Sequence, residues 1–208
     1  MNYLILGFIT GLSLILAIGA QNIFVIEQGL KKQYVFLVCL ICSFSDLILI
    51  FLGIFLFEYF RNLFTNNIEL IFNILLFFFL AYFVTTKLRN KYENFDINTD
   101  KNKISLKNVI AKTLGFTYLN PHVYSDTVFF LGNFSKNFLI TQKYYFGIGA
   151  SIASFLFFLS LGYLSKFSSK YLQSRKVWKI INLFIIIFMS ILAIYVLLDI
   201  FNLKIHIF

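Results

Sequence analysis

The chain has 208 residues, of which 60% are hydrophobic and 13% are charged, and its net charge is +9. Soluble domains are nearer to about 45–50% apolar and about 25% charged residues. The composition therefore excludes an ordinary soluble domain and predicts an integral membrane protein. The loops contain no glycine-rich phosphate motif, zinc-ligand spacing or nucleophile–base pair, so we expect neither an enzyme nor a bound metal or cofactor.

Six apolar runs follow one another, each near the roughly 20 residues that span hydrocarbon as an α-helix. None shows the alternation of a membrane β-strand, so we predict an all-α, polytopic membrane protein with six transmembrane helices. The first run is too long for a signal-peptide core and no Lys or Arg precedes Lys31, which predicts a retained helix. The fourth run is the most polar, which leaves five spans as an alternative. The runs cover residues 3–26, 34–57, 68–86, 113–132, 144–164 and 177–201.

Basic residues are concentrated in three of the predicted loops. Fourteen of the eighteen Lys and Arg residues follow the first, third and fifth runs, and four lie on the opposite side. Short loops that are rich in Lys and Arg stay in the cytoplasm, so we expect these three loops inside the cell and both termini outside. The positive charge is then explained by topology and contact with anionic lipid, and nucleic-acid binding is not expected.

A linker and a short internal similarity predict that the chain consists of two similar halves. Residues 87–112 are polar and rich in Asn and Lys, which predicts a basic cytoplasmic linker between residues 1–86 and residues 113–208. The sequence IGAQN at 18–22 is similar to LNPHV at 119–123. With three helices in each half, the second copy would be inverted in the membrane. A 3+3 inverted repeat with interrupted helices one and four is typical of secondary transporters, whose sites lie near the midplane.

Helix-weakening residues predict where helices one and four are interrupted. Pro121, the only proline in the chain, removes a backbone donor and clashes with the preceding turn. Gly19 and Ala20 occupy the matching place in the first run. The freed backbone groups must face protein or a water-filled cavity rather than lipid. A competing interpretation is that Gly19 and Gly115 only permit close packing of helices.

Two carboxylates within the apolar runs are the strongest functional signal. Asp46 lies near the middle of the second run and Asp126 within the fourth, where a charge costs about 2.5–3.5 kcal/mol on insertion scales. Asp126 follows His122 by one helical turn, so the two share a face. Structural interpretations remain open, because Ser43 or Ser45 could hydrogen-bond Asp46, and Asp126 could serve only as the partner of His122.

Two further polar features have alternative interpretations. Gln21 and Asn22 could line a site or could only join helices by hydrogen bonds. Cys39 and Cys42 form a CxxC pattern, but they lie inside an apolar run without a basic setting that would lower a thiol pKa. We therefore do not expect redox or metal chemistry there, although a membrane thiol carrier remains an alternative function.

The motifs resemble the lysine exporter (LysE) family of bacterial amino-acid exporters. Residues 7–57 are similar to the start of that family, and they contain IGAQN at 18–22, EQGLKK at 27–32 and SDL at 45–47. LNPHVYSDT at 119–127 resembles the second family motif, and KVWKIIN at 176–182 resembles the lead into the last helix. The first family motif usually reads Gly-Pro-Gln-Asn, and here Ala20 stands in the proline position. The second motif is more similar to the basic-amino-acid branch than to the homoserine/threonine branch.

The resemblance implies a multi-pass protein of the bacterial inner membrane that exports lysine or arginine. On this hypothesis it is an antiporter with alternating access, driven by the membrane potential or the proton gradient. Asp46 and Asp126 would bind the charged side chain of the substrate and a coupling cation such as a proton, and His122 is a candidate proton carrier. The residues expected to contact the amino-acid backbone are Gln21, Asn22 and Asn120.

Other functions remain open at this point. The carboxylates could serve protons during export of a neutral solute, or they could bind a metal cation. A passive channel is a further alternative. The sequence leaves the oligomeric state open, including a homo-oligomer.

Overall fold

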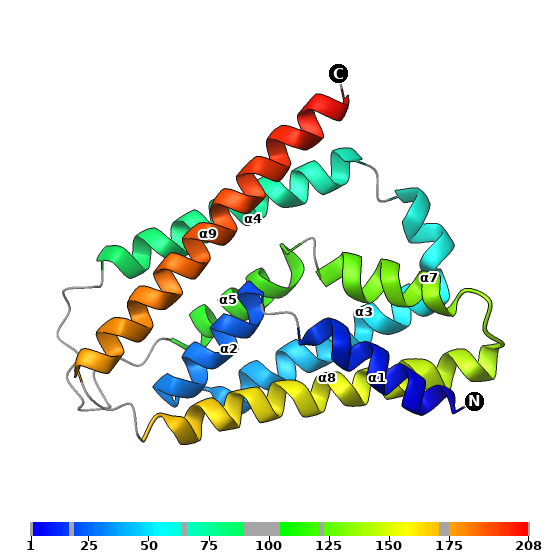
Figure 1. Cartoon of the computed structure of the whole chain (residues 1–208), viewed down its shortest axis with the longest axis horizontal. Coiled ribbons are helices and arrows are strands. Elements are labelled where there is room, and N and C mark those ends of the chain that lie inside the picture. Colours follow the sequence, from blue (N-terminus) through cyan, green and yellow to red (C-terminus); the bar gives the residue numbers. More distant parts are fainter. Residues whose placement is uncertain are drawn as a thin grey trace.

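The computed structural model describes residues 2–16, 19–63, 66–89, 105–120, 123–170 and 175–207. All regular elements in these ranges are helices, which confirms the all-α prediction for them (Figure 1). Pro121, His122 and residues 90–104 of the predicted linker lie outside the described residues. The elements are α1 (Tyr3–Ile15), α2 (Ala20–Lys31), α3 (Val35–Leu63), α4 (Asn66–Arg89), α5 (Leu106–Tyr118), η2 (Tyr124–Phe130, a π-helix), α7 (Leu131–Ser135), α8 (Ile140–Ser168) and α9 (Arg175–Ile207).

Several helices are long and apolar enough to cross a membrane. Three stretches qualify among the described residues: Val35–Phe57, Ile140–Ser168 and Lys179–Leu198. The pair α1 and α2 is bent by 83° and makes a fourth span if it is counted as one broken helix. The apolar part of α4, Leu70–Thr86, is shorter. These lengths fit the roughly 20 residues that a spanning helix needs, and they support a multi-pass membrane protein.

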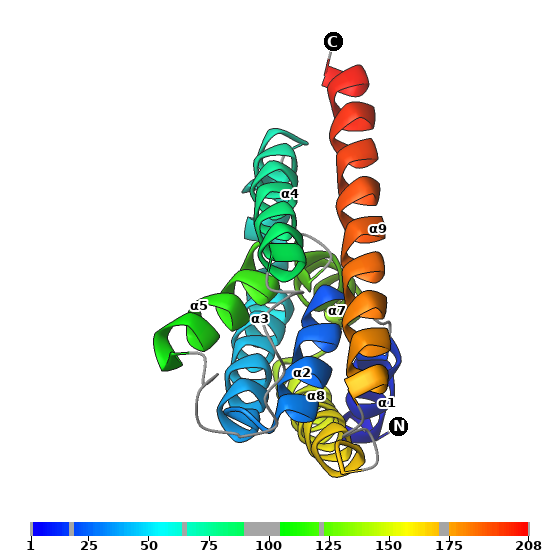
Figure 2. The same ribbon diagram turned by 90° about the vertical axis from the view of Figure 1, so that its left-hand side faces the viewer.

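Much apolar surface faces outward on α4 and α9. These two helices pack against each other and lie along one side of the remaining helices (Figure 2). Phe78 of α4 is 66% exposed and Ile180 of α9 is 65% exposed. Large contiguous apolar surface is rare on soluble monomers, so contact with lipid is the simplest explanation for this face.

The helices of the two chain halves pack reciprocally. The bent pair α1 and α2 packs on α8 of the second half, and α5, η2 and α7 pack on α3 of the first half. The C-terminal ends of α2, α4 and α8 and the starts of α5 and α9 lie towards the left side in Figure 1. The three segments that hold most of the Lys and Arg residues therefore join helices at the same end of the molecule.

Glycines bring the paired helices close together. A Cβ atom on Gly149 of α8 would lie 2.0 Å from the carbonyl oxygen of Leu4 in α1, and one on Gly53 of α3 would lie 2.6 Å from the Cα of Val128 in η2. Small residues at such crossings let backbones approach closely, which favours helix association in membranes. These contacts fix the broken segments α1 and η2 against the long helices α8 and α3, and so they position the cavity described next.

Candidate functional site

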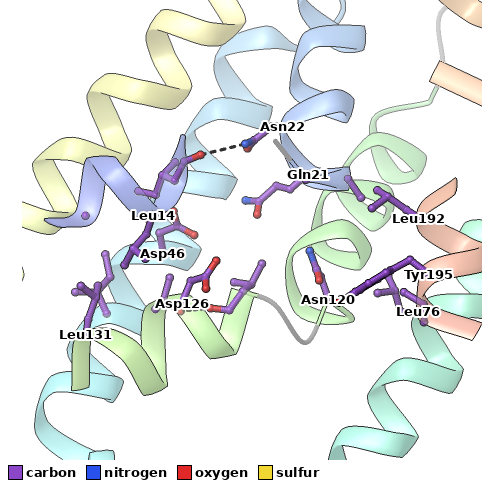
Figure 3. A pocket seen from close by; sticks show the side chains of 18 of the residues that line it. Leu14, Gln21, Asn22, Asp46, Leu76, Asn120, Asp126, Leu131, Leu192 and Tyr195 are labelled. Carbon is purple, nitrogen blue, oxygen red and sulfur yellow. Dashed lines mark hydrogen bonds between the residues drawn. The ribbon is translucent and has the colours of Figure 1, made fainter. Parts of the chain in front are cut away.

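A cavity of about 320 Å³ lies between the interrupted helices (Figure 3). Its lining comes from both chain halves, and includes the start of α2, the middle of α3, the start of η2 and part of α9. Small-molecule sites typically have volumes of roughly 300–1,000 Å³, so the cavity can hold a small solute. The polar residues that line it are Gln21, Asn22, Asp46, Asn120, Asp126, Thr127 and Tyr195.

Asp46 projects from α3 into the cavity and is only 3% exposed. Its Oδ2 accepts a hydrogen bond of 2.8 Å from the Ser154 hydroxyl of α8. The sequence-based alternative that Ser43 or Ser45 is the partner is therefore wrong. The hydroxyl of Ser43 is buried without a hydrogen-bond partner. A bond from a hydroxyl stabilises a carboxylate without neutralising it, so Asp46 keeps the capacity to bind a cation or a proton.

Asp126 lies in the first turn of η2 and lines the same cavity. Figure 3 shows the carboxylates of Asp46 and Asp126 near each other, at one end of the open space. The two residues are 80 positions apart in the sequence and come from different halves. π-helical turns are rare in proteins, and those that occur often lie at functional sites. The fold therefore brings the two predicted carboxylates together in one chamber.

Gln21, Asn22 and Asn120 also line the cavity, and each is less than a tenth exposed. The Asn22 side-chain nitrogen donates a hydrogen bond of 3.2 Å to the carbonyl oxygen of Ile15 (Figure 3). Asn22 thus joins α2 to the end of α1 across the interruption of the first predicted helix. The Nε2 atom of Gln21 is buried without a hydrogen-bond partner. A buried amide donor without a partner is costly, and a ligand in the cavity would remove that cost.

The first helix is interrupted at the predicted place. α1 ends at Ile15, and α2 begins at Ala20 with Gly19 as its N-cap in an extended conformation. No atom lies within 4 Å of a Cβ built on Gly19, so close packing does not explain that glycine. At Gly115 a Cβ would lie 2.6 Å from the Phe79 ring, so close packing does explain that one. α5 ends at Tyr118, directly before the segment that contains Pro121.

Part of the cavity wall was not identified from the sequence. Tyr195 of α9 and Leu76 of α4 line it, as do their neighbours Leu192, Val196 and Leu80. These residues lie in uniformly apolar runs, where no polar signal distinguishes a cavity wall from a lipid-facing surface. Ser154 also lies in an apolar run, and no local signal in the sequence indicates its contact with Asp46.

The two cysteines are fully buried and free. The thiol of Cys39 donates to the carbonyl oxygen of Phe158 in α8 at 3.1 Å. Both cysteines belong to the apolar cluster between the helices, so their surroundings are those of structural rather than reactive thiols. In the part of the chain that the structure describes, no group of three or more His, Cys, Asp or Glu side chains could hold a metal ion.

Comparison with known proteins gives the same family that the motifs resemble. The model of the LysE type translocator family matches residues 12–200. The arginine exporter protein ArgO of Pectobacterium atrosepticum is 33% identical over 184 residues, which is 86% of this chain and 88% of the relative. ArgO of Salmonella typhimurium is 32% identical over 193 residues, which is 92% of each chain. No solved structure matches the chain. With nearly its whole length matched, the chain belongs to the LysE family of translocators, whose members are transporters rather than enzymes.

Proposed function

We propose that the protein exports a cationic amino acid, arginine or lysine, from the bacterial cytoplasm. The observation that carries this proposal is the pairing of Asp46 and Asp126 in one small cavity. No Lys or Arg belongs to the described residues that line the cavity. Two carboxylates in one cavity produce a field that favours a cation, and the low dielectric around them strengthens the attraction.

Arginine is the first candidate among cationic amino acids. The relatives that match most of the chain are named arginine exporters, and the NPHVYSD motif resembles the basic-amino-acid branch of the family. An arginine side chain can bind a carboxylate with two parallel hydrogen bonds, whereas a lysine ammonium binds as a compact point charge. Both fit the proposal, and the transport assay below separates them.

The remaining polar groups of the cavity suit the amino-acid backbone. The N-terminal turn of α2, which contains Ala20, Gln21 and Asn22, lines the cavity. The N-terminal end of a helix carries partial positive charge and unpaired N–H groups, which suits the substrate carboxylate. We assign the unpartnered amide of Gln21 to the same carboxylate, and Asn120 to the α-ammonium group. His122 adjoins this site in the sequence and remains a candidate proton carrier.

The export of a cation requires coupling. The membrane potential opposes exit of a positive charge by about 2.3 kcal/mol per 100 mV. We propose antiport with a cation, a proton in the simplest case, that enters as the substrate leaves. The substrate and the proton would then bind to Asp46 and Asp126 in turn, as the site alternates between the two sides of the membrane.

The proposed topology has six spans in a 3+3 inverted repeat, with residues 1–86 and 113–208 as the halves and 87–112 as the linker. The reciprocal packing of the interrupted helices on α8 and α3 supports it, as does the gathering of the basic segments at one end (Figure 1). The excess of Lys and Arg at that end supports a cytoplasmic location for it, with both termini outside.

Loaded proteoliposomes test this function. Vesicles that contain the purified protein and radiolabelled arginine or lysine should release the label, and an uncoupler should change the rate. Retention of both amino acids by vesicles with correctly inserted protein would exclude the proposal. Growth tests against canavanine, homoserine and cadmium distinguish a cationic amino acid from a neutral one and from a metal cation.

A further inference from the structure

One face of α2 continues from the cavity towards the basic end of the molecule. Ala20 lines the cavity, and Phe24, Glu27 and Lys31 follow it at intervals of three or four residues. Residues at this spacing share one face of a helix. The face thus carries a cavity residue, an aromatic ring, a carboxylate and an ammonium group in succession, over about 16 Å at 1.5 Å per residue.

A face of α5, continued by Asn120 just beyond the C-cap of the helix, repeats this order from the opposite half of the chain. Lys112, Phe116 and Asn120 are spaced by four residues, and Asn120 lines the cavity. α2 and α5 contact each other. The Phe24 and Phe116 rings lie 5.0 Å apart between centroids. The two helices therefore present matching levels: cavity, aromatic and charged.

The aromatic level separates the cavity from the charged level. The Phe83 ring of α4 joins it, with its centroid 5.0 Å from that of Phe116 and 6.4 Å from that of Phe24. All three side chains are at most 3% exposed. The three buried rings therefore pack together between the cavity residues and the charged residues of α2 and α5.

The charged level contains the carboxylate of Glu27, which lies near the ammonium groups of Lys31 and Lys112. Glu27 is 2% exposed, and its Oε1 lies 2.5 Å from the Lys31 Nζ atom, whose side chain is 23% exposed. Lys112 is close enough for its charge to interact with both residues. Gln28, in the same turn of α2, has both side-chain polar atoms buried without a hydrogen-bond partner. The amide of Gln28 is therefore a polar group beside Glu27 that a bound solute could satisfy.

We propose that Glu27 is an access subsite for the cationic side chain of the substrate, on the cytoplasmic side of the aromatic level. Lys31 occupies this subsite when no substrate is present, because its ammonium group offers the same chemistry on a flexible tether. An incoming ammonium or guanidinium group displaces Lys31 from Glu27 before the rings of Phe24 and Phe116 separate. This inference rests on the proposed export of a cationic amino acid.

Competition predicts opposite effects of removing the two partners. We would measure initial efflux from right-side-out vesicles loaded with increasing arginine, which gives KM on the cytoplasmic side. Glu27→Gln should raise KM about tenfold, the change that corresponds to roughly 1.4 kcal/mol. Lys31→Gln should lower KM several-fold, because the competing ammonium group is gone. Lys170→Gln removes an exposed lysine beside Phe167 and should leave KM unchanged.

An ion pair that is only structural gives a different result. Losing either partner of a buried pair destabilises the same contact, so both substitutions would then impair transport or insertion. KM changes of the same sign, or no change in either variant, would overturn the inference. Should Glu27→Gln fail to reach the membrane, Lys31→Gln decides alone, since an unchanged or higher KM overturns competition. Absence of arginine efflux from the wild-type protein would instead reject the proposed function.

Discussion

The central cavity and the basic end of α2 both hold carboxylates inside the protein, but with different partners. Asp46 accepts a hydrogen bond from a neutral hydroxyl, that of Ser154, and shares a chamber with a second carboxylate. Glu27 contacts the ammonium group of Lys31, and Lys112 is nearby. The first region has an excess of negative charge among its described lining residues, whereas the second pairs its carboxylate with ammonium groups of the protein itself.

This difference indicates in which region the carboxylates stabilise an added cation most. A buried carboxylate that already has an ammonium partner gains little net charge stabilisation from a substrate and can only exchange one cation for another. Two carboxylates that share one cavity attract an added cation together, and its binding also relieves their mutual repulsion. The central cavity therefore suits binding of the cationic substrate during transport. The basic end of α2 suits the transient exchange of one cation for another.

Neutralising a central carboxylate gives the largest expected effect. Asp46→Asn and Asp126→Asn should each lower arginine efflux by about 100-fold or more, because truncating a buried charge interaction costs about 2–5 kcal/mol. Asp→Glu at either position should retain part of the activity. Efflux from loaded vesicles with equal amounts of inserted protein measures this. Normal transport by both Asn variants would rule out a site built from the two carboxylates.

Opening the aromatic level tests whether the two regions are separated. In a protein whose two cysteines are replaced by Ala, Ala20→Cys places a thiol in the cavity. A membrane-impermeant thiol reagent added on the cytoplasmic side should label it slowly. Adding Phe24→Ala should raise the labelling rate about tenfold, because removing a buried phenyl ring leaves a large gap. Equal rates with and without Phe24→Ala would show that the rings do not close the cavity.

Removing the hydroxyl partner of Asp46 tests whether this neutral hydrogen bond contributes to binding of the substrate. Ser154→Ala should raise KM for arginine roughly fivefold, since a hydrogen bond to a charged group contributes about 1.5–3 kcal/mol and the substrate compensates part of the loss. Ser151→Ala is a matched control in the same helix, because its buried hydroxyl bonds only to the Gly147 carbonyl oxygen. KM values that change equally in both variants would contradict a specific role for Ser154.

Replacing the cysteines should have the smallest effect. Cys39→Ala combined with Cys42→Ala removes two buried thiols that line neither region. Arginine efflux should stay within about twofold of the wild-type rate, because each substitution deletes only one small buried group. Loss of transport in well-inserted protein would favour the alternative of a membrane thiol carrier.

The sequence predicted those parts of the fold and site that follow from the energetic cost of a single residue in a membrane helix. Asp46 and Asp126 were identified because lipid penalises charge, and the interruption at Gly19 because glycine weakens a helix. The lengths of the apolar runs also predicted helices where α3, α8 and α9 lie. The predicted halves and topology remain predictions.

Features that depend on packing between distant segments could not be predicted in the same way. Ser154 reaches Asp46 across 108 residues of sequence, and nothing local distinguishes it from Ser43 or Ser45. Phe24 and Phe116 are two of 29 phenylalanines, and only the approach of α2 to α5 makes them a pair. The same approach makes Glu27 part of a charged level instead of a residue near a helix end.

Equilibrium binding by the purified protein tests the central claim most directly, with arginine compared with citrulline, its uncharged isostere. Wild-type protein should bind arginine, and both Asp46→Asn and Asp126→Asn should weaken that binding about 100-fold, by the loss of one buried charge interaction. Citrulline should bind all three proteins equally weakly. Wild-type affinity for arginine in either variant, or equal affinity of the wild-type protein for arginine and citrulline, would contradict a cation site built from the two carboxylates.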